Sequence, residues 1–340
     1  MRINPRCCLL MLITGLLGCD KGNEDIMNAE QETMDAVETL GVKIEGLSIT
    51  FEGKYSLSSP MAQDFSVGFE ISETDGFETV IGRMPLQNAN RQNEFAYVST
   101  GSTRGETYYV RAYMQNQFAV FYGSVKSFKT TTEYNPTVGE AVDLGLSVKW
   151  ASFNVGAQKP EDYGDYFTWG ETLPGFNYSW SKYKYCKGSA TTLTKYCVRS
   201  YYGYNGYTDT KTILDPEDDV SHVKWGGKWR MPTKEEFDEL SNSVNCNWTW
   251  TTRNGVNGYL VTSKKSGHEG ASIFLPAAGF RRFTDLNTIG GIGYYWSYSL
   301  FEGNPYLAWV FSCYNLSYSD HYFTQNFERV YGCTVRPVCP

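Results

Sequence analysis

Apolar and polar residues alternate along most of the chain, and only one stretch shows a clear helical period. Between residues 42 and 132, short segments with a period of two are separated by turn residues, which is typical of antiparallel strands. These segments are VKIEGLSITF, FSVGFEIS, TVIGRM, EFAYVST, TYYVRAYMQN and VFYGSVKSFKT. Their number and spacing predict an all-β sandwich over residues 41–132.

The helical stretch is WGGKWRMPTKEEFDEL, residues 225–240. Thr233 followed three residues later by Glu236 is a capping box, in which each side chain satisfies a free amide at a helix start. Apolar residues then recur with helical spacing at Phe237, Leu240 and Val244. We therefore expect a short amphipathic helix that packs on a core and carries no chemistry of its own.

A second domain is expected over residues 141–340, after a linker at 133–140 punctuated by Pro136 and Gly139. All nine Trp lie beyond this linker. Strands are predicted in DLGLSVKWASFNVGA, in YGDYFTWGE and in five segments after the helix: GYLVTS, SIFLPAAGFR, GYYWSYS, AWVFSCYN and GCTVRPV. Tyr166 and Trp169 of the second segment should pack on opposite faces. The pattern alone indicates β-rich structure with one clear helix.

The section 172–224 has little apolar periodicity and is long for a loop inside a compact domain. Such loops are functional or disordered. Its many tyrosines argue against simple disorder.

The start of the chain predicts export. Arg2 and Arg6 precede an apolar run that ends in LLGC, which resembles the lipobox of bacterial lipoproteins. Residues 1–18 would be removed and Cys19 would carry the lipid; an ordinary secretory leader with an incidental cysteine is the alternative. Residues 19–40 are acidic and are expected to form a solvated tether. The expected location is the outer membrane, with the protein held at the cell surface by lipid.

Composition agrees with an extracellular β-rich protein and excludes one class of partner. The 340 residues are 16% aromatic and only 20% charged, with a formal net charge of −7. Loss of Arg2 and Arg6 with the leader lowers that charge to −9. Since no basic patch offsets this balance, we expect no nucleic-acid partner.

Several motifs together carry a family resemblance over residues 138–340. They are VDLGLSVKWASFNVGA, EDYGDYFTWGE, WGGKWRMPTKEEFDEL, SIFLPAAGFR, YYWSYS and TVRPV. This part resembles the Fibrobacter succinogenes major paralogous domain (FISUMP), which is similar to C-type-lectin-like modules. The resemblance implies an α+β, C-type-lectin-like fold. Residues 41–132 resemble fibronectin-III-like repeats of bacterial surface proteins.

The sequence gives little support for a metal or cofactor site. His222, His268 and His321 share no ligand spacing. The acidic run DPEDD (215–219) can offer oxygen ligands to calcium, but such a run more often caps a helix start after proline. The triplets through which C-type lectins bind sugar and calcium are absent. We expect no cofactor and no metal.

Six cysteines beyond the leader are disulfide candidates: Cys186, Cys197, Cys246, Cys313, Cys333 and Cys339. Cys186 and Cys197 could close the long loop, and the others could pair near the terminal strands; free buried thiols are the alternative. No nucleophile motif of a serine hydrolase occurs. Glu171 is the best single carboxylate for glycoside hydrolysis, although its family context suggests a structural hydrogen bond.

Aromatic side chains are the remaining signal for binding. Tyrosine offers a large contact area, a small entropy cost and a hydroxyl, so tyrosine-rich loops suit recognition. The expected ligand-binding residues are Trp180, Tyr183, Tyr185, Tyr201, Tyr202, Tyr204 and Tyr207, with Arg281, Arg282 and Asp285 on the rim. Alternatively, these rings merely attach a long insertion to the sheet.

The function expected from the sequence is a non-catalytic, lipid-anchored surface protein that binds glycan or another surface polymer. A structural or accessory subunit that binds other proteins is the alternative. An enzyme is the third reading.

Overall fold

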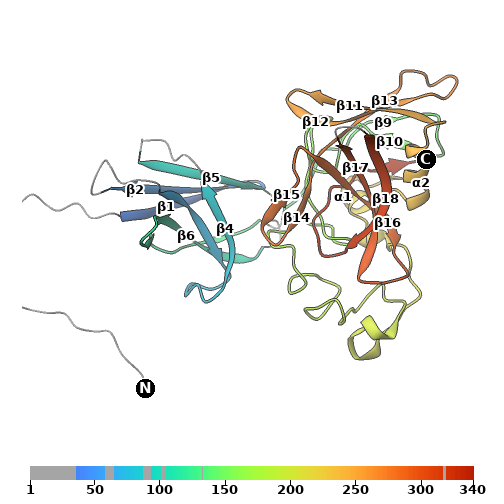
Figure 1. Ribbon diagram of the computed structural model, residues 1–340. Coiled ribbons are helices and arrows are strands. Elements are labelled where there is room, and N and C mark those ends of the chain that lie inside the picture. The colour runs from blue at the N-terminus through green and yellow to red at the C-terminus, as the bar shows by residue number, and fades with distance from the viewer. Residues whose placement is uncertain (1–35, 58–64, 87–92, 101–104, 132, 317–318) are drawn as a thin grey trace, which may run out of the picture. The chain divides into compact units, whose positions relative to one another are not determined.

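The computed structural model describes residues 36–57, 65–86, 93–100, 105–131, 133–316 and 319–340 (Figure 1). The described residues all belong to one compact unit. The expected leader, Cys19 and most of the expected tether lie outside the described residues. In the described part of the chain, no helix is long and apolar enough to cross a membrane.

The N-terminal part of the described chain consists of two antiparallel sheets, as the alternating pattern predicts. One sheet has the strand order β1–β2–β5, with β1 at Ala36–Glu45, β2 at Ser48–Ser56 and β5 at Glu94–Thr100. The other has the order β4–β3–β6–β7, and β8 also pairs with β6. Its strands are β3 (Ser66–Ser72), β4 (Val80–Leu86), β6 (Thr107–Gln115), β7 (Val120–Tyr122) and β8 (Lys126–Lys129).

Both sheets bury aromatic side chains in one shared core, which is the arrangement of a β-sandwich. Phe51 of β2 and Phe69 of β3 are both fully buried, with ring centroids 5.7 Å apart. Phe95 of β5 lies 5.0 Å from Phe69. Phe176, from the long section 172–224, joins the same core and lies 5.3 Å from Tyr108 of β6.

The first strands differ from the prediction in two places. VKIEGLSITF is a hairpin rather than one strand, because Gly46 turns the chain with a φ of +60°. In addition, β1 begins at Ala36, inside the expected tether. Thr39 explains the earlier start: its buried hydroxyl accepts a 2.8 Å hydrogen bond from the Ala112 amide of β6.

Three antiparallel sheets and a hairpin make up most of the regular structure beyond residue 133. The first sheet is β9 (Ala141–Val142), β10 (Lys149–Ala151) and β19 (Val338–Cys339). The second is β11 (Cys246–Arg253), β12 (Val256–Ser263) and β13 (Ser272–Pro276), and the third is β16 (Ile292–Leu300), β17 (Leu307–Leu316) and β18 (Ser319–Glu328). The hairpin is β14 (Phe280–Arg282) with β15 (Asp285–Asn287).

The C-terminal segment ties these pieces together through single bridges rather than one long strand. Cys333 pairs with Phe167, Thr334 with Tyr295, and Val338 with Arg230. The predicted strand GCTVRPV is therefore wrong over most of its length. YGDYFTWGE is also irregular, but Tyr166 and Trp169 do enter different hydrophobic clusters, as expected.

The predicted helix is confirmed as α2, Lys234–Ser241, with both hydrogen bonds of the Thr233–Glu236 capping box. Phe237 and Leu240 are fully buried. Val244 is 74% exposed because the helix has already ended, so its place on the apolar stripe is wrong. A second helix, α1 (Val220–Trp225), lies at the end of the long section.

Arg336 of the TVRPV motif is fully buried and holds three segments together. Its guanidinium donates to the Asn154 side chain at 2.7 Å and to the backbone carbonyls of Ala151 at 2.9 Å and Phe274 at 2.7 Å. Burial lowers the pKa of Arg336 to about 10. The motif that carries much of the family resemblance is thus structural.

The cysteine pairing expected from the sequence is not found. Cys186, Cys197, Cys246, Cys313, Cys333 and Cys339 are all free thiols. Cys186 and Cys197 instead donate weak hydrogen bonds to the carbonyls of Trp180 and Arg199, at 3.1 and 3.2 Å. The long section is therefore held by other contacts.

Candidate functional site

The described residues 152–245 contain no strand, yet the long section 172–224 is well organised. Its only repetitive structure before α1 is three 3-10 turns, Ser200–Tyr202, Tyr204–Gly206 and Pro216–Asp218. Single bridges connect Leu193 to both Cys186 and Gly203. Aromatic stacking and a charged network supply the rest of the frame.

One set of the expected binding residues forms a buried aromatic column. Rings meet edge to face from Trp180 to Tyr183 (5.7 Å), Tyr185 (5.8 Å), Tyr196 (5.7 Å) and Trp169 (5.1 Å). Tyr183 and Tyr185 are 3% and 6% exposed. Their assignment as ligand-binding residues is wrong, because their rings are core and their hydroxyls bond within the protein.

Arg329 stabilises this aromatic column through hydrogen bonds. Its side chain is fully buried and donates to the Tyr183 hydroxyl at 2.9 Å and to the Tyr196 carbonyl at 2.8 Å. It also donates to the Pro305 carbonyl at 2.8 Å and the Lys195 carbonyl at 3.1 Å. One cation therefore joins the long section to the loop before β17.

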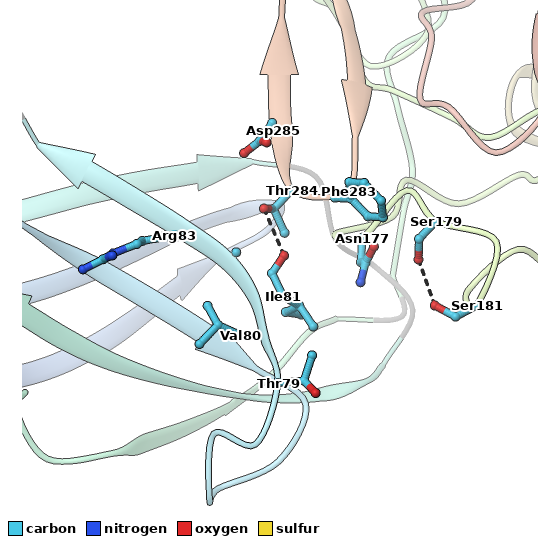
Figure 2. A pocket seen from close by; sticks show the side chains of 11 residues that line it. Thr79, Val80, Ile81, Arg83, Asn177, Ser179, Ser181, Phe283, Thr284 and Asp285 are labelled. Carbon is cyan, nitrogen blue, oxygen red and sulfur yellow. Dashed lines mark hydrogen bonds between the residues drawn. The ribbon is translucent and has the colours of Figure 1, made fainter.

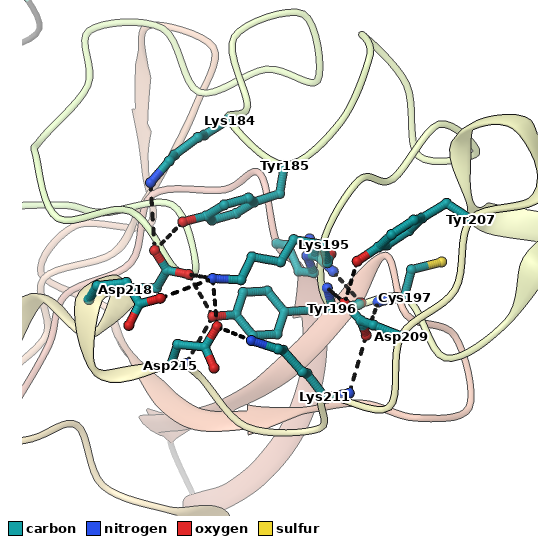
Figure 3. A network of polar contacts seen from close by, with 12 residues as sticks. Lys184, Tyr185, Lys195, Tyr196, Cys197, Tyr207, Asp209, Lys211, Asp215 and Asp218 are labelled. Atoms are coloured by element: carbon teal, nitrogen blue, oxygen red, sulfur yellow. Dashed lines mark hydrogen bonds and ion pairs between the residues drawn. The ribbon is translucent and has the colours of Figure 1, made fainter.

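Asp218 is the second anchor of the long section (Figure 3). This buried carboxylate accepts from Lys195 Nζ at 2.5 Å, from the Tyr196 hydroxyl at 2.6 Å and from the Tyr185 hydroxyl. Burial by itself would raise the pKa of Asp218, but these hydrogen bonds bring it below its usual value. Lys195 also lies 2.6 Å from Asp215.

The acidic run that contains Asp218 caps a helix, as the sequence favours. Asp219 accepts from the backbone amides of Ser221 at 2.8 Å and His222 at 3.3 Å, and from Met231 at 2.8 Å. Burial raises the pKa of Asp219 to about 6. Among the residues that the structure describes, no three His, Cys, Asp or Glu side chains are grouped to hold a metal ion.

Glu171 also has a structural contact. Its buried carboxylate accepts the Lys184 amide at 2.8 Å, which agrees with the structural hydrogen bond suggested by the sequence.

A different set of tyrosines faces solvent. Tyr201, Tyr204 and Tyr207 are 77%, 44% and 39% exposed. Tyr202 is half-buried: its ring lies 5.3 Å from Tyr306, and its hydroxyl donates to the Asn304 side chain at 3.0 Å. We call Tyr201, Tyr202, Tyr204 and Tyr207 the tyrosine surface.

The backbone beneath the tyrosine surface is fixed. Leu193 donates its amide to the Tyr202 carbonyl and accepts the Tyr204 amide, both at 2.8 Å. Gly203 is obligatory, because a Cβ there would lie 1.8 Å from the Tyr207 carbonyl oxygen. Asp209 accepts the Tyr207 hydroxyl at 3.1 Å. These contacts fix the backbone that carries the rings.

Arg281, Arg282 and Asp285 form a separate group on the β14–β15 hairpin. The Arg281 guanidinium lies 5.1 Å from the Tyr166 ring, and that of Arg282 lies 5.4 Å from the Phe283 ring. Asp285 lines a cavity of about 560 Å³ together with Asn177 and Phe283 (Figure 2). Arg281 and Asp285 line cavities whose walls include no residue of the tyrosine surface, and Arg282 lines neither cavity. The rim that the sequence suggested for the tyrosine surface is therefore not formed by these cavities.

The residues that decide these roles are Arg329 and Asp218, which hold the buried tyrosines, and Asn177 and Phe283, which line the cavity. The sequence points to Asp218 only as part of the acidic run DPEDD, and to Phe283 only as an aromatic residue after the FRR run. Nothing in the pattern marks Asn177.

The chain matches no protein-family model, and a search of curated proteins also gives no match. The resemblance to the FISUMP and lectin-like domains therefore remains a prediction.

Proposed function

We propose that this chain is a non-catalytic, lipid-anchored surface protein that binds glycan through the tyrosine surface. The observation that carries the proposal is the exposure of Tyr201, Tyr204 and Tyr207 on a backbone held by internal hydrogen bonds. Exposed rings on such a backbone offer apolar faces for the C–H groups of sugars and hydroxyls for their oxygens. Little side-chain entropy is lost on binding.

A non-catalytic role is supported by the engagement of the candidate carboxylates. Glu171 accepts a backbone amide, and Asp218 is surrounded by three donors. Both carboxylates are buried, and their hydrogen bonds stabilise the long section.

We further propose that residues 141–340 adopt the α+β, C-type-lectin-like fold and belong with the FISUMP domains. The support is the capped helix α2 among antiparallel sheets, and the pairing of β10, near the start of this part, with β19 at its end. Residues 133–140 remain the expected linker.

The binding proposal is tested on a glycan array with the purified mature chain. We expect bound glycans for the wild type, and their loss in Tyr201→Ala/Tyr204→Ala. Phe118→Ala is the matched control, since Phe118 is 86% exposed in the turn between β6 and β7. Copurification of a stable protein partner with no glycan signal would instead favour an accessory subunit, and product formation would favour an enzyme.

The anchor is tested separately, because it rests on the LLGC sequence alone. We expect Cys19→Ala to move the protein out of the membrane fraction and to abolish palmitate labelling. Equal labelling of the mutant and the wild type would contradict the anchor while leaving the binding proposal untouched.

A further inference from the structure

A second place in the molecule offers the chemistry that sugars need. Two cavities adjoin at the tip of the β14–β15 hairpin, with volumes of about 560 and 610 Å³. They share Arg83, Thr284 and Asp285 as lining residues. Each lies within the range typical of small-ligand sites.

Asn177 in the first cavity has a side-chain amide oxygen without a hydrogen-bond partner. Its residue is 92% buried, from 8% exposure, and its Oδ1 atom makes no hydrogen bond. Figure 2 shows the amide extending from its loop into the space between Phe283 and Ile81. A buried amide oxygen that lacks a donor destabilises the free protein and is satisfied when a ligand hydroxyl reaches it.

Phe283 supplies an aromatic face beside that amide. Its ring is 49% exposed, and its backbone adopts a left-handed φ of +52° between β14 and β15. Two backbone hydrogen bonds to Tyr178, at 2.9 and 3.0 Å, hold this conformation. The ring is therefore presented by a fixed hairpin tip rather than by a free side chain.

Four hydroxyl side chains in the remaining lining both donate and accept hydrogen bonds: Thr79, Ser179, Ser181 and Thr284. Ser179 and Ser181 lie with their hydroxyls 3.0 Å apart, and the Thr284 hydroxyl donates to the Ile81 carbonyl at 3.3 Å. Asp285 adds a carboxylate at the exposed edge. Vicinal sugar hydroxyls match this mixture, whereas an apolar ligand would leave it unsatisfied.

We propose that the Asn177–Phe283 cavity binds one pyranose unit of a neutral oligosaccharide, and that the adjoining cavity holds the next unit. The second cavity suits this role because Tyr97, Tyr163 and Asn287 contribute rings and an amide to its lining. The two cavities and the tyrosine surface are proposed to bind the same class of ligand, glycans. They share no residues.

The test uses maltose, cellobiose and lactose as probes in saturation-transfer NMR with the purified mature chain. We expect at least one disaccharide to bind, and Phe283→Ala to weaken it about tenfold. Asn177→Ala should weaken it similarly while leaving the melting temperature unchanged or higher, because the variant removes an unpartnered polar atom. A merely structural asparagine would show the opposite: a lower melting temperature and unchanged binding.

Phe118→Ala is the matched control and should leave disaccharide binding intact, because Phe118 is 86% exposed and lines neither cavity. Disaccharide binding that is kept in Phe283→Ala and Asn177→Ala but lost in Tyr201→Ala/Tyr204→Ala would overturn the cavity proposal and support the tyrosine surface. No signal from any of the three disaccharides would also overturn it. The array result for the tyrosine surface is a separate measurement and would stand in either case.

Discussion

Two stretches of the same long section contain similar tyrosines that have opposite environments. In residues 180–196, Tyr183 and Tyr185 are buried, and their hydroxyls donate to the Trp169 carbonyl and to Asp218. In residues 200–207, Tyr201 and Tyr204 are exposed. Tyrosine density alone therefore does not mark a binding surface. The tyrosines of this section are buried where their rings and hydroxyls contact a buried acceptor and a buried cation, here Asp218 and Arg329.

The largest effect is expected from breaking the buried column. Tyr183→Ala should cost about 3–5 kcal/mol, because a fully packed aromatic ring is removed. Tyr183→Phe is the matched variant and should cost only about 1–3 kcal/mol, since it leaves the Trp169 carbonyl and Arg329 without the hydroxyl. Denaturant unfolding measures both values. Similar small losses for the two variants would show that the ring is not core.

The next effect is expected at Asp218 and depends on pH. Asp218→Asn should cost about 1–3 kcal/mol at neutral pH, because Lys195 and two tyrosine hydroxyls lose a charged acceptor. The folded pKa of Asp218 lies below its unfolded value, so its contribution is present above the unfolded pKa and is lost as pH falls through the folded pKa.

The stability gap between wild type and Asp218→Asn should therefore be full at pH 7 and should close below about pH 3.9, the usual value for aspartate. Unfolding curves at several pH values check this. A gap that stays constant into acid would mean that the charge of Asp218 does not hold the section.

Most of the strand content could be predicted, because alternation of apolar residues directly reports one buried face. The capping box at Thr233 and Glu236 likewise marked α2. Val244 was misplaced because the helix ends at Ser241, with Asn242 as its C-cap. The division of the tyrosines was beyond prediction for a physical reason: Arg329 lies more than a hundred residues away in sequence from the rings that it fixes.

A smaller effect is expected at Tyr202, which stands between the two groups. Tyr202→Phe should cost about 0.5–1.5 kcal/mol, the usual net value of one hydrogen bond, here to Asn304. Asn304→Ala should cost a similar amount, and the double variant should cost less than the sum because both changes remove the same contact. Additive losses in a double-mutant cycle would contradict the contact.

No effect at all is expected from reducing agents. The section is held by Asp218, Arg329 and ring stacking, and its cysteines Cys186 and Cys197 are free. The melting temperature of the mature chain should be the same with and without a thiol reductant. A fall of several degrees in the presence of the reductant would instead indicate the Cys186–Cys197 disulfide that the sequence suggested.

The tyrosine surface is tested most directly as a glycan-binding site by thermal melts of Tyr201→Ala/Tyr204→Ala and the wild type, with glycan binding measured on the same samples. Exposed rings contribute little to stability, so the two proteins should melt within about 2 °C of each other while binding is lost. A drop of about 10 °C, which corresponds to several kcal/mol for a domain of this size, would place these rings in the core. That result would contradict the tyrosine surface as a binding site.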